Sequence, residues 1–310
     1  MQIIFEISRE HPTLPIAEIR ACLNTYKIKF DELYHDGTYI AKIYEKRKLK
    51  KVANRLAMSH SINELLGKNE EELLKNLREK NKSFKVEGGN LYVRKKIGKL
   101  LVEKKNLKVD LEEPDIIIKI LDKFFCREIY KIDRSQFEKR RGSKRPFSIP
   151  TTMHPRLARA MINLSEIKEN EVLLDPFCGT GGILIEAGLL GIKVIGIDIK
   201  RELIEGCKRN LEYYGIKNYE LYNEDMRNVD IKVDAVVTDF PYGRASHLSD
   251  KMDKLYKEAI RKIAEYTDKA VVGLPSLKFI DYIEKYFIIK EIHPVRVHKS
   301  LIRFFYVLKL

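Results

Sequence analysis

From residue 172 to residue 310, short apolar runs alternate with longer stretches of helical period, and this rhythm restricts the fold more than any other feature. Runs such as 172–174 and 235–238 predict strands, whereas 201–213 repeats apolar residues at helical spacing. Alternating strands and helices are typical of a parallel sheet covered on both faces. Because 287–292 and 304–308 leave no room for a helix between them, we expect an antiparallel C-terminal strand. The predicted fold is therefore α/β with a doubly wound sheet.

Aspartates stand at the ends of three successive predicted strands, where ligands bind in doubly wound sheets. Asp175 precedes a glycine-rich loop whose Gly179 and Gly181 permit a tight turn. A carboxylate there would repel a pyrophosphate, but it can accept hydrogen bonds from an amino group. This favours S-adenosylmethionine, which carries an amino-acid end and a sulfonium cation, over a dinucleotide.

The next two strand ends extend this interpretation. Asp198 can accept both ribose hydroxyls, and Asp225 can accept the adenine amine while Met226 contacts the ring. One such acid alone is more often an ordinary strand-end residue, but three in succession predict a cofactor site. Phe177, Cys178 and Ile199 complete the expected cofactor-binding set from the same loops.

The fourth strand end reads "VVTDFPYG", residues 236–243. An exocyclic amine on a base is a poor nucleophile, because its lone pair is delocalised into the ring. Asp239 can accept one N–H and the carbonyl of Phe240 the other, which would aim the lone pair at a methyl group. Pro241 keeps residue 240 extended, and Tyr242 can stack on an extruded base. These four residues are the catalytic candidates, against the plainer interpretation of a capped strand end.

Positive charge is concentrated in the first half of the chain, whose formal net charge is +14. Residues 1–150 hold 34 lysines and arginines against 22 acids, whereas 151–310 hold 25 against 23. A basic half beside a nearly neutral half predicts a polyanion-binding region. Residues 133–150 are basic and proline-rich, as in an exposed linker. The RNA-binding candidates are Arg94, Lys95, Lys96, Lys139, Arg140, Arg141, Lys144 and Arg145.

Three stretches occur in the order IPTTMHPRLARAMINL, LLDPFCGTGGILIEAGLLG and TDFPYGR, and with them the chain resembles the archaeal tRNA guanosine-10 N2-methyltransferase family. The stretch LYVRKKIGKLLVEKKNLKVDLEEPDIIIKI resembles a THUMP domain preceded by a ferredoxin-like segment. The resemblance covers essentially the whole chain. It departs at Phe240, where the family's motif has proline.

The resemblance implies a Rossmann-like class I S-adenosylmethionine-dependent methyltransferase that adds one or two methyl groups to the N2 amine of a guanine in tRNA. It also implies that Thr152 and His154 pack against the methionine end of the cofactor. The domains expected from it and from the sequence pattern are a ferredoxin-like segment (1–48), a THUMP-like α+β domain (49–132), a basic linker (133–150) and the methyltransferase domain (151–310).

Three other functions remain open at this point: methylation of another tRNA guanine such as acceptor-stem position 6, DNA adenine N6-methylation, and RNA binding without catalysis. The four cysteines lie far apart with no C-x-x-C pair, which argues against a zinc site and fits a reducing cytoplasm. We expect no metal, no membrane span, no secretory signal and a monomer, and the sequence leaves open whether a small activating subunit is needed.

Overall fold

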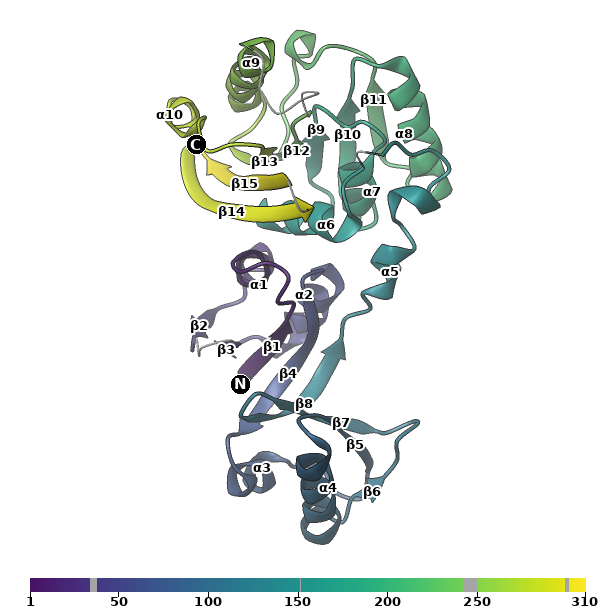
Figure 1. The fold of residues 1–310 in the computed structure, drawn as a ribbon, viewed down its shortest axis with the longest axis vertical. Coiled ribbons are helices and arrows are strands. Elements are labelled where there is room, and N and C mark those ends of the chain that lie inside the picture. Colours follow the sequence, from purple (N-terminus) through teal and green to yellow (C-terminus); the bar gives the residue numbers. More distant parts are fainter. Residues whose placement is uncertain (34–37, 151, 242–249, 299–300) are drawn as a thin grey trace. The chain divides into compact units, whose positions relative to one another are not determined.

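The computed structural model describes residues 1–33, 38–150, 152–241, 250–298 and 301–310 (Figure 1). The chain forms two compact units. The first contains 1–8, 26–54 and 59–133, and the second contains 9–25, 55–58 and 134–310. None of the described helices is both long and apolar enough to cross a membrane.

The first unit is built on a sheet that contains eight strands among the described residues, in the order β2-β3-β1-β4-β8-β7-β5-β6. Leucine, isoleucine and phenylalanine side chains from α3, α4, β5 and β7 form one of its hydrophobic cores. The strands are β1 (Gln2–Ile7), β2 (Phe30–Glu32), β3 (Tyr39–Ile43), β4 (Ser59–Gly67), β5 (Ser83–Gly88), β6 (Lys108–Val109), β7 (Ile116–Leu121) and β8 (Phe124–Lys131). The helices are η1 (Lys46–Lys48), α2 (Leu49–Arg55), α3 (Glu70–Asn76) and α4 (Leu91–Lys105).

The structure differs from the local apolar pattern at one place in this unit. The apolar spacing from residue 49 to about residue 66 has a helical period, but the helix ends at Arg55 and a strand begins at Ser59. That strand, β4, pairs antiparallel with both β1 and β8. Backbone pairing on both sides therefore overrides a local pattern that is compatible with a helix.

The second unit contains a sheet in the order β11-β10-β9-β12-β13-β15-β14, with seven strands among the described residues. The strands from β11 to β13 are parallel, and β15 runs antiparallel to both of its neighbours, which confirms the expected reversal at the C-terminus. The strands are β9 (Val172–Asp175), β10 (Lys193–Ile197), β11 (Tyr219–Tyr222), β12 (Ala235–Asp239), β13 (Lys269–Leu274), β14 (Ile288–His298) and β15 (Leu301–Lys309).

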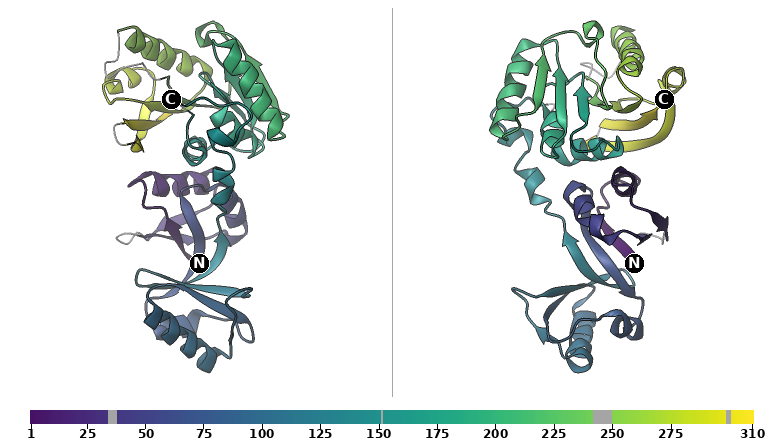
Figure 2. Two further views of the ribbon diagram at one scale, coloured as in Figure 1. Left: turned by 45° about the vertical axis from the view of Figure 1, so that its right-hand side comes forward. Right: turned by 180° about the vertical axis from the view of Figure 1, so that it is seen from behind.

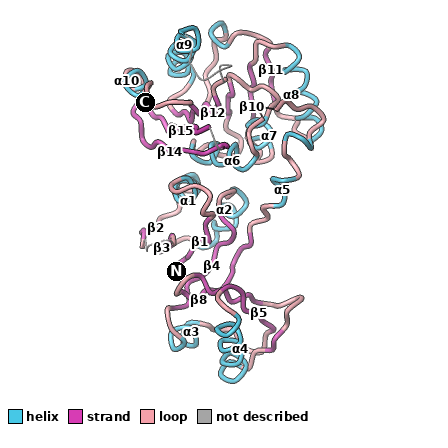
Figure 3. The backbone as a smooth tube through the Cα atoms, viewed as in Figure 1, coloured by secondary structure: helices cyan, strands magenta, loops and turns pink. Residues whose placement is uncertain are grey.

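Helices cover both faces of this sheet (Figures 2 and 3). Leu173, Ala235 and Val237 pack with α1, α6, α7 and α8, whereas Leu174 and Val236 pack with α9 and α10 on the other face. The alternation follows from the period of two residues along a strand. The helical segments are α1 (Leu14–Thr25), α5 (Ser135–Glu138), η2 (Gly142–Lys144), α6 (Pro155–Leu164), α7 (Gly182–Gly188), α8 (Arg201–Tyr213), η3 (Met226–Asn228), α9 (Asp250–Tyr266) and α10 (Ile280–Ile283).

Helix α1 is part of the second unit although it lies near the start of the chain. The Glu18 side chain is fully buried, and it accepts hydrogen bonds from Asn163 Nδ2 on α6 at 2.8 Å and from the backbone N–H groups of Ala57 and Met58 at 3.0 and 2.9 Å. The predicted limit at residue 151 therefore omits segments that pack into the same core.

Candidate active site

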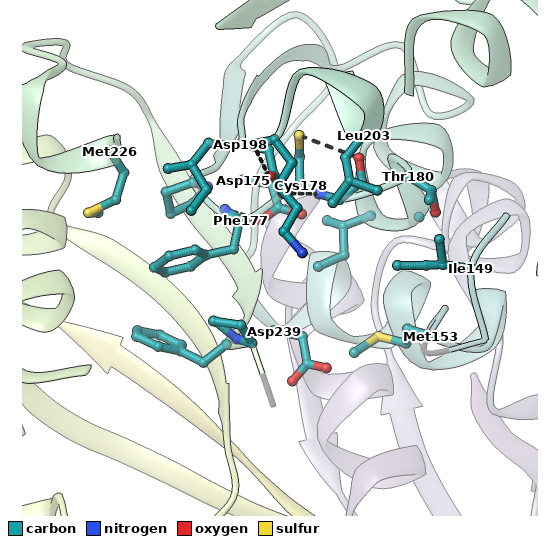
Figure 4. A pocket seen from close by; sticks show the side chains of 18 of the residues that line it. Ile149, Met153, Asp175, Phe177, Cys178, Thr180, Asp198, Leu203, Met226 and Asp239 are labelled. Carbon is teal, nitrogen blue, oxygen red and sulfur yellow. Dashed lines mark hydrogen bonds between the residues drawn. The ribbon is translucent and has the colours of Figure 1, made fainter. Parts of the chain in front are cut away.

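The carboxyl ends of β9, β10 and β12 border a pocket of about 570 Å³, a volume typical of cofactor sites (Figure 4). Ile149 and Met153 lie opposite Phe177 and Met226 across this pocket. The structure brings together most of the residues that the sequence singled out. Those that line the pocket are Thr152, Asp175, Phe177, Cys178, Gly179, Asp198, Ile199, Asp225, Met226, Asp239, Phe240 and Pro241.

Two of the expected cofactor residues are not among the lining residues. His154 caps α6, since its Nδ1 accepts the backbone N–H of Arg156 at 3.2 Å, and burial lowers its pKa. Gly181 instead shapes the loop: its φ is 81°, and a Cβ there would lie 2.6 Å from the Sγ of Cys207. Tyr242 lies outside the described residues.

Asp175 is buried at the end of β9, where only 2% of it is exposed. Its Oδ1 accepts hydrogen bonds from Thr238 Oγ1 at 2.7 Å and from the backbone N–H of Phe177 at 3.1 Å. Burial raises the pKa of Asp175 to about 7, although the two hydrogen bonds act in the opposite direction. A cationic group placed beside this carboxyl would favour its ionised form. Thr238 was missed by the sequence reasoning, because a threonine inside a β-rich run looks like an ordinary strand residue.

Asp198 is held by backbone donors at the end of β10. Its Oδ2 accepts the N–H of Gly179 at 3.1 Å, and its Oδ1 accepts the N–H of Lys200 at 2.9 Å. Burial raises the pKa of this carboxyl as well. Since each carboxylate oxygen has two acceptor positions, Asp198 can still accept a pair of vicinal hydroxyls in a fixed orientation.

Asp225 lines the pocket, but its carboxylate already has a strong partner. Arg227 donates from its backbone N–H and its Nε to Oδ1, both at 2.9 Å, and from Nη2 to Oδ2 at 2.6 Å. These bonds lower the pKa of Asp225. The sequence reasoning overlooked Arg227, although an arginine two residues after an acid is a recognisable signal. Met226, 2% exposed, remains available as an apolar wall of the pocket.

Asp239 ends β12 and contacts Arg303 of β15, a residue that the sequence reasoning also missed. The Arg303 side chain is fully buried and donates from Nη2 to the Asp239 carboxylate and to the carbonyl oxygen of Phe240. These are the two groups expected to accept the N–H bonds of a target amine. An arginine inside the apolar run "SLIRFFYVL" was a usable signal, because a buried charge needs a partner.

The expected exposed linker is partly wrong. Arg140 and Arg145 are buried in the second unit, where Arg140 forms a two-pronged ion pair with Glu186 at 2.6 and 3.0 Å. Arg159 donates to the same carboxylate at 2.9 Å. Because the guanidinium groups of Arg140 and Arg159 neutralise and anchor the buried Glu186, Arg140 is unavailable to an external phosphate. The neighbouring candidates that are exposed are Lys139, Arg141 and Lys144.

The remaining RNA-binding candidates lie on α4 in the first unit. Lys95 and Lys96 are exposed, and Arg94 is half-buried. Lys96 forms an ion pair with Glu70 of α3, which raises the pKa of the lysine.

Two families match the chain. The family described as "RMKL-like, methyltransferase domain" matches residues 142–303, and one described as "DNA methylase" matches 17–209, ending before the Asp239 motif. A curated tRNA (guanine(10)-N2)-dimethyltransferase of Methanothermobacter thermautotrophicus is 37% identical, over 98% of this chain and 98% of that protein. One of Pyrococcus abyssi is 37% identical, over 67% of this chain and 66% of its own length.

The fold is also found in solved structures. The crystal structure of TrmN from Thermus thermophilus superposes with a TM-score of 0.55 at 18% identity, covering 100% of this chain and 99% of that chain. Another structure, of a putative methyltransferase described as complexed with SAH, has a TM-score of 0.54 at 14% identity and covers 99% of this chain and 97% of its own. At these identities the likeness supports the Rossmann-like fold alone.

Proposed function

Because the chain belongs to the family of tRNA (guanine(10)-N2)-methyltransferases, we propose that it methylates the N2 amine of guanine 10 in tRNA. The methyl donor is S-adenosylmethionine, which supplies an electrophilic methyl group on its sulfonium. The archaeal relatives carry the name dimethyltransferase, so we propose two successive transfers to the same amine. One observation carries the proposal: a carboxylate and a backbone carbonyl from consecutive residues line the same pocket as the strand-end acids.

The chemistry of the pocket fits the donor. Asp175, whose pKa lies near 7, suits a cationic amino group, and the oriented Asp198 carboxylate suits the ribose hydroxyls. Met226 and Phe177 supply apolar surface for the adenine ring. Asp225, which Arg227 occupies, is better placed to orient the loop than to accept the adenine amine with both oxygens.

In this proposal the target amine lies between Asp239 and the carbonyl of Phe240. Both acceptors draw the N–H bonds into one orientation, so that the nitrogen lone pair points at the methyl group. As the nitrogen gains positive charge in the transition state, the carboxylate stabilises it. Tyr242 is proposed to stack on the guanine.

The direct test is to incubate the purified chain with labelled S-adenosylmethionine and an unmodified tRNA transcript, and then to map the labelled nucleoside. We expect N2,N2-dimethylguanosine at position 10, and no label in a transcript whose guanine 10 is replaced. Label at another guanine, for example position 6, would contradict the assignment. Turnover by the chain alone would also show that no activating subunit is required.

The match to a DNA methylase family keeps DNA adenine as a second candidate substrate. That match ends at residue 209, and therefore covers cofactor-site residues but not Asp239. Offering duplex DNA and tRNA at equal concentration in one reaction distinguishes the two. We expect label in the tRNA only.

We propose that the ferredoxin-like segment (1–48) and the THUMP-like domain (49–132), which lie mostly in the first unit, bind the tRNA. The exposed lysines on α4 support this role, and the second unit has exposed basic residues of its own, Lys139, Arg141 and Lys144. We also propose a cytoplasmic monomer, which light scattering of the purified chain tests. The four cysteines, Cys22, Cys126, Cys178 and Cys207, are buried thiols, which suits a reducing compartment.

A further inference from the structure

The segment from Asp239 to Pro241 is held at every residue. The backbone N–H of Phe240 donates to the carbonyl of Gly273 on β13 at 3.1 Å. A side chain at position 273 would collide with Oδ1 of Asp239, so glycine lets the carboxylate lie against the neighbouring strand. Tyr256 of α9 donates from its hydroxyl to the carbonyl of Pro241 at 2.6 Å.

Arg303 adds a contact of a different kind, because it joins the two acceptors themselves. Its Nη2 reaches both the Asp239 carboxylate and the Phe240 carbonyl. Arg303 is fully buried and does not line the pocket, whereas both of its partners do. The guanidinium therefore acts from behind the site. Since a carboxylate or carbonyl oxygen has more than one acceptor position, the guanidinium can occupy one position of each acceptor while the target amine uses another.

The need for such a contact follows from residue 240. A proline at that position would fix φ through its ring, whereas a phenylalanine before Pro241 is restricted only to the broader extended region. Here the Phe240 ring is fully buried, with its centroid 5.2 Å from that of Phe177 and 5.3 Å from that of Tyr256. Ring packing fixes the side chain, and the Arg303 hydrogen bond fixes the carbonyl of the same residue.

Arg303 also bears on the charge of the site. The negative charge of Asp239 acts to raise the pKa of Asp175 on β9 and that of Tyr256 on α9, in both cases after the larger effect of burial. A guanidinium paired with Asp239 favours its ionised form against this repulsion. The ionised form matters because a protonated carboxyl would present a donor to the amine in place of an acceptor.

We propose that Arg303 is a positioning residue for methyl transfer, which fixes the spacing of the two amine acceptors and keeps Asp239 ionised. The inference rests on the proposed function, because it takes the amine to lie between those acceptors. Because Arg303 does not line the pocket, it acts in this proposal through Asp239 and Phe240, with no contact of its own to the amine or the cofactor.

The test compares Arg303→Met and Arg303→Lys with the wild-type chain in single-turnover methylation of tRNA at saturating S-adenosylmethionine. Arg303→Met is expected to lower the rate by about 10²-fold, the size of effect that misplacement of reacting groups produces. The affinity for S-adenosylmethionine, measured by calorimetry, should change little. The acidic limb of the pH–rate profile should move to higher pH. Lysine keeps the charge but donates as a point, so Arg303→Lys should leave that limb in place and lower the rate by about tenfold.

Lys309→Met is the matched control, because Lys309 is a basic residue of the same strand that pairs with Glu166 at 3.3 Å. It should leave the rate and the pH profile unchanged. Equal rates for wild type and Arg303→Met would overturn the inference, and so would a parallel loss of rate and cofactor affinity. If the methionine variant does not fold, a wild-type rate for Arg303→Lys overturns it alone. Failure of the proposed function is distinguishable, since the wild-type chain would then not methylate tRNA.

Discussion

Cofactor affinity should depend on pH through Asp175, and Asp175→Asn should remove most of that dependence. Burial holds the pKa of this carboxyl near 7 in the free protein. A cationic amino group binds the ionised carboxylate better than the neutral acid, so binding lowers this pKa and releases a proton. Affinity must then fall as the pH falls below 7, because more of the free protein carries the proton that binding has to displace.

The size of the effect follows from the pKa. With a value near 7, about three quarters of Asp175 is ionised at pH 7.5 and about 3% at pH 5.5. If only the ionised form binds, the dissociation constant rises about 25-fold over this range, which corresponds to about 2 kcal/mol. The range stops at pH 7.5 because a free α-amino group loses its own proton near pH 7.7–8.0.

The assay is isothermal calorimetry with S-adenosylmethionine at half-unit steps of pH, repeated in two buffers of different ionisation enthalpy to count the protons released. Asp175→Asn should bind more weakly at pH 7.5 and show only the pH dependence that comes from Asp198, whose pKa burial also raises. Asp225→Asn is the control, since its pKa is lowered and it does not titrate in this range. A flat wild-type profile, or a 25-fold dependence retained in Asp175→Asn, would refute the reasoning.

Four further outcomes are expected. Asp239→Ala should keep cofactor affinity but lose about 10²–10³-fold in single-turnover rate, because the lost contact forms in the transition state; an active variant would mean that another group orients the amine. Glu18→Ala should lower the free energy of unfolding in urea by about 3 kcal/mol, because it strands the Asn163 amide and two backbone donors. Phe240→Pro should cost about 3–5 kcal/mol, since it removes a fully buried ring and a backbone donor; unchanged stability would contradict that. Neutralising the exposed residues Lys139, Arg141 and Lys144 should reduce the slope of log affinity against log salt concentration for tRNA by about two units, because each phosphate contact contributes about 0.7–0.9. An unchanged slope would exclude these residues from the interface.

The limits of the methyltransferase domain could not be predicted from the order of residues along the chain. A basic, proline-rich stretch before residue 151 resembled a linker, and a fragment 151–310 would then be expected to fold alone. In the structure the buried Glu186 carboxylate forms an ion pair with Arg140 from that stretch, and the Asn163 amide donates a hydrogen bond to Glu18 of the N-terminal helix. A fragment beginning at residue 151 would leave a buried carboxylate with one of its two arginines, so we now expect it to be unstable. The complete second unit consists of 9–25, 55–58 and 134–310. Because these ranges are separated in the sequence by parts of the first unit, no single continuous fragment contains the second unit alone.

The sequence by itself determined that the second half of the chain forms a doubly wound sheet and that its last strand is reversed. It also determined most of the residues that line the pocket. It could do so because these properties are local: β-branched runs and helical periods predict the elements, and parallel strands bring their carboxyl ends to one edge. Asp175, Asp198 and Asp239 were recognisable because each directly ends its strand.

Only the tertiary structure decided which partners those residues have. Arg303 lies 64 residues after Asp239, and Thr238 lies 63 residues after Asp175, so neither contact follows from spacing along the chain. The same holds for Arg140 and Arg145, whose charge suggested an RNA surface until their burial became visible. The sequence does not distinguish a charged side chain in solvent from one in the core. What differs is the set of groups packed around it, and long-range folding alone assembles that set.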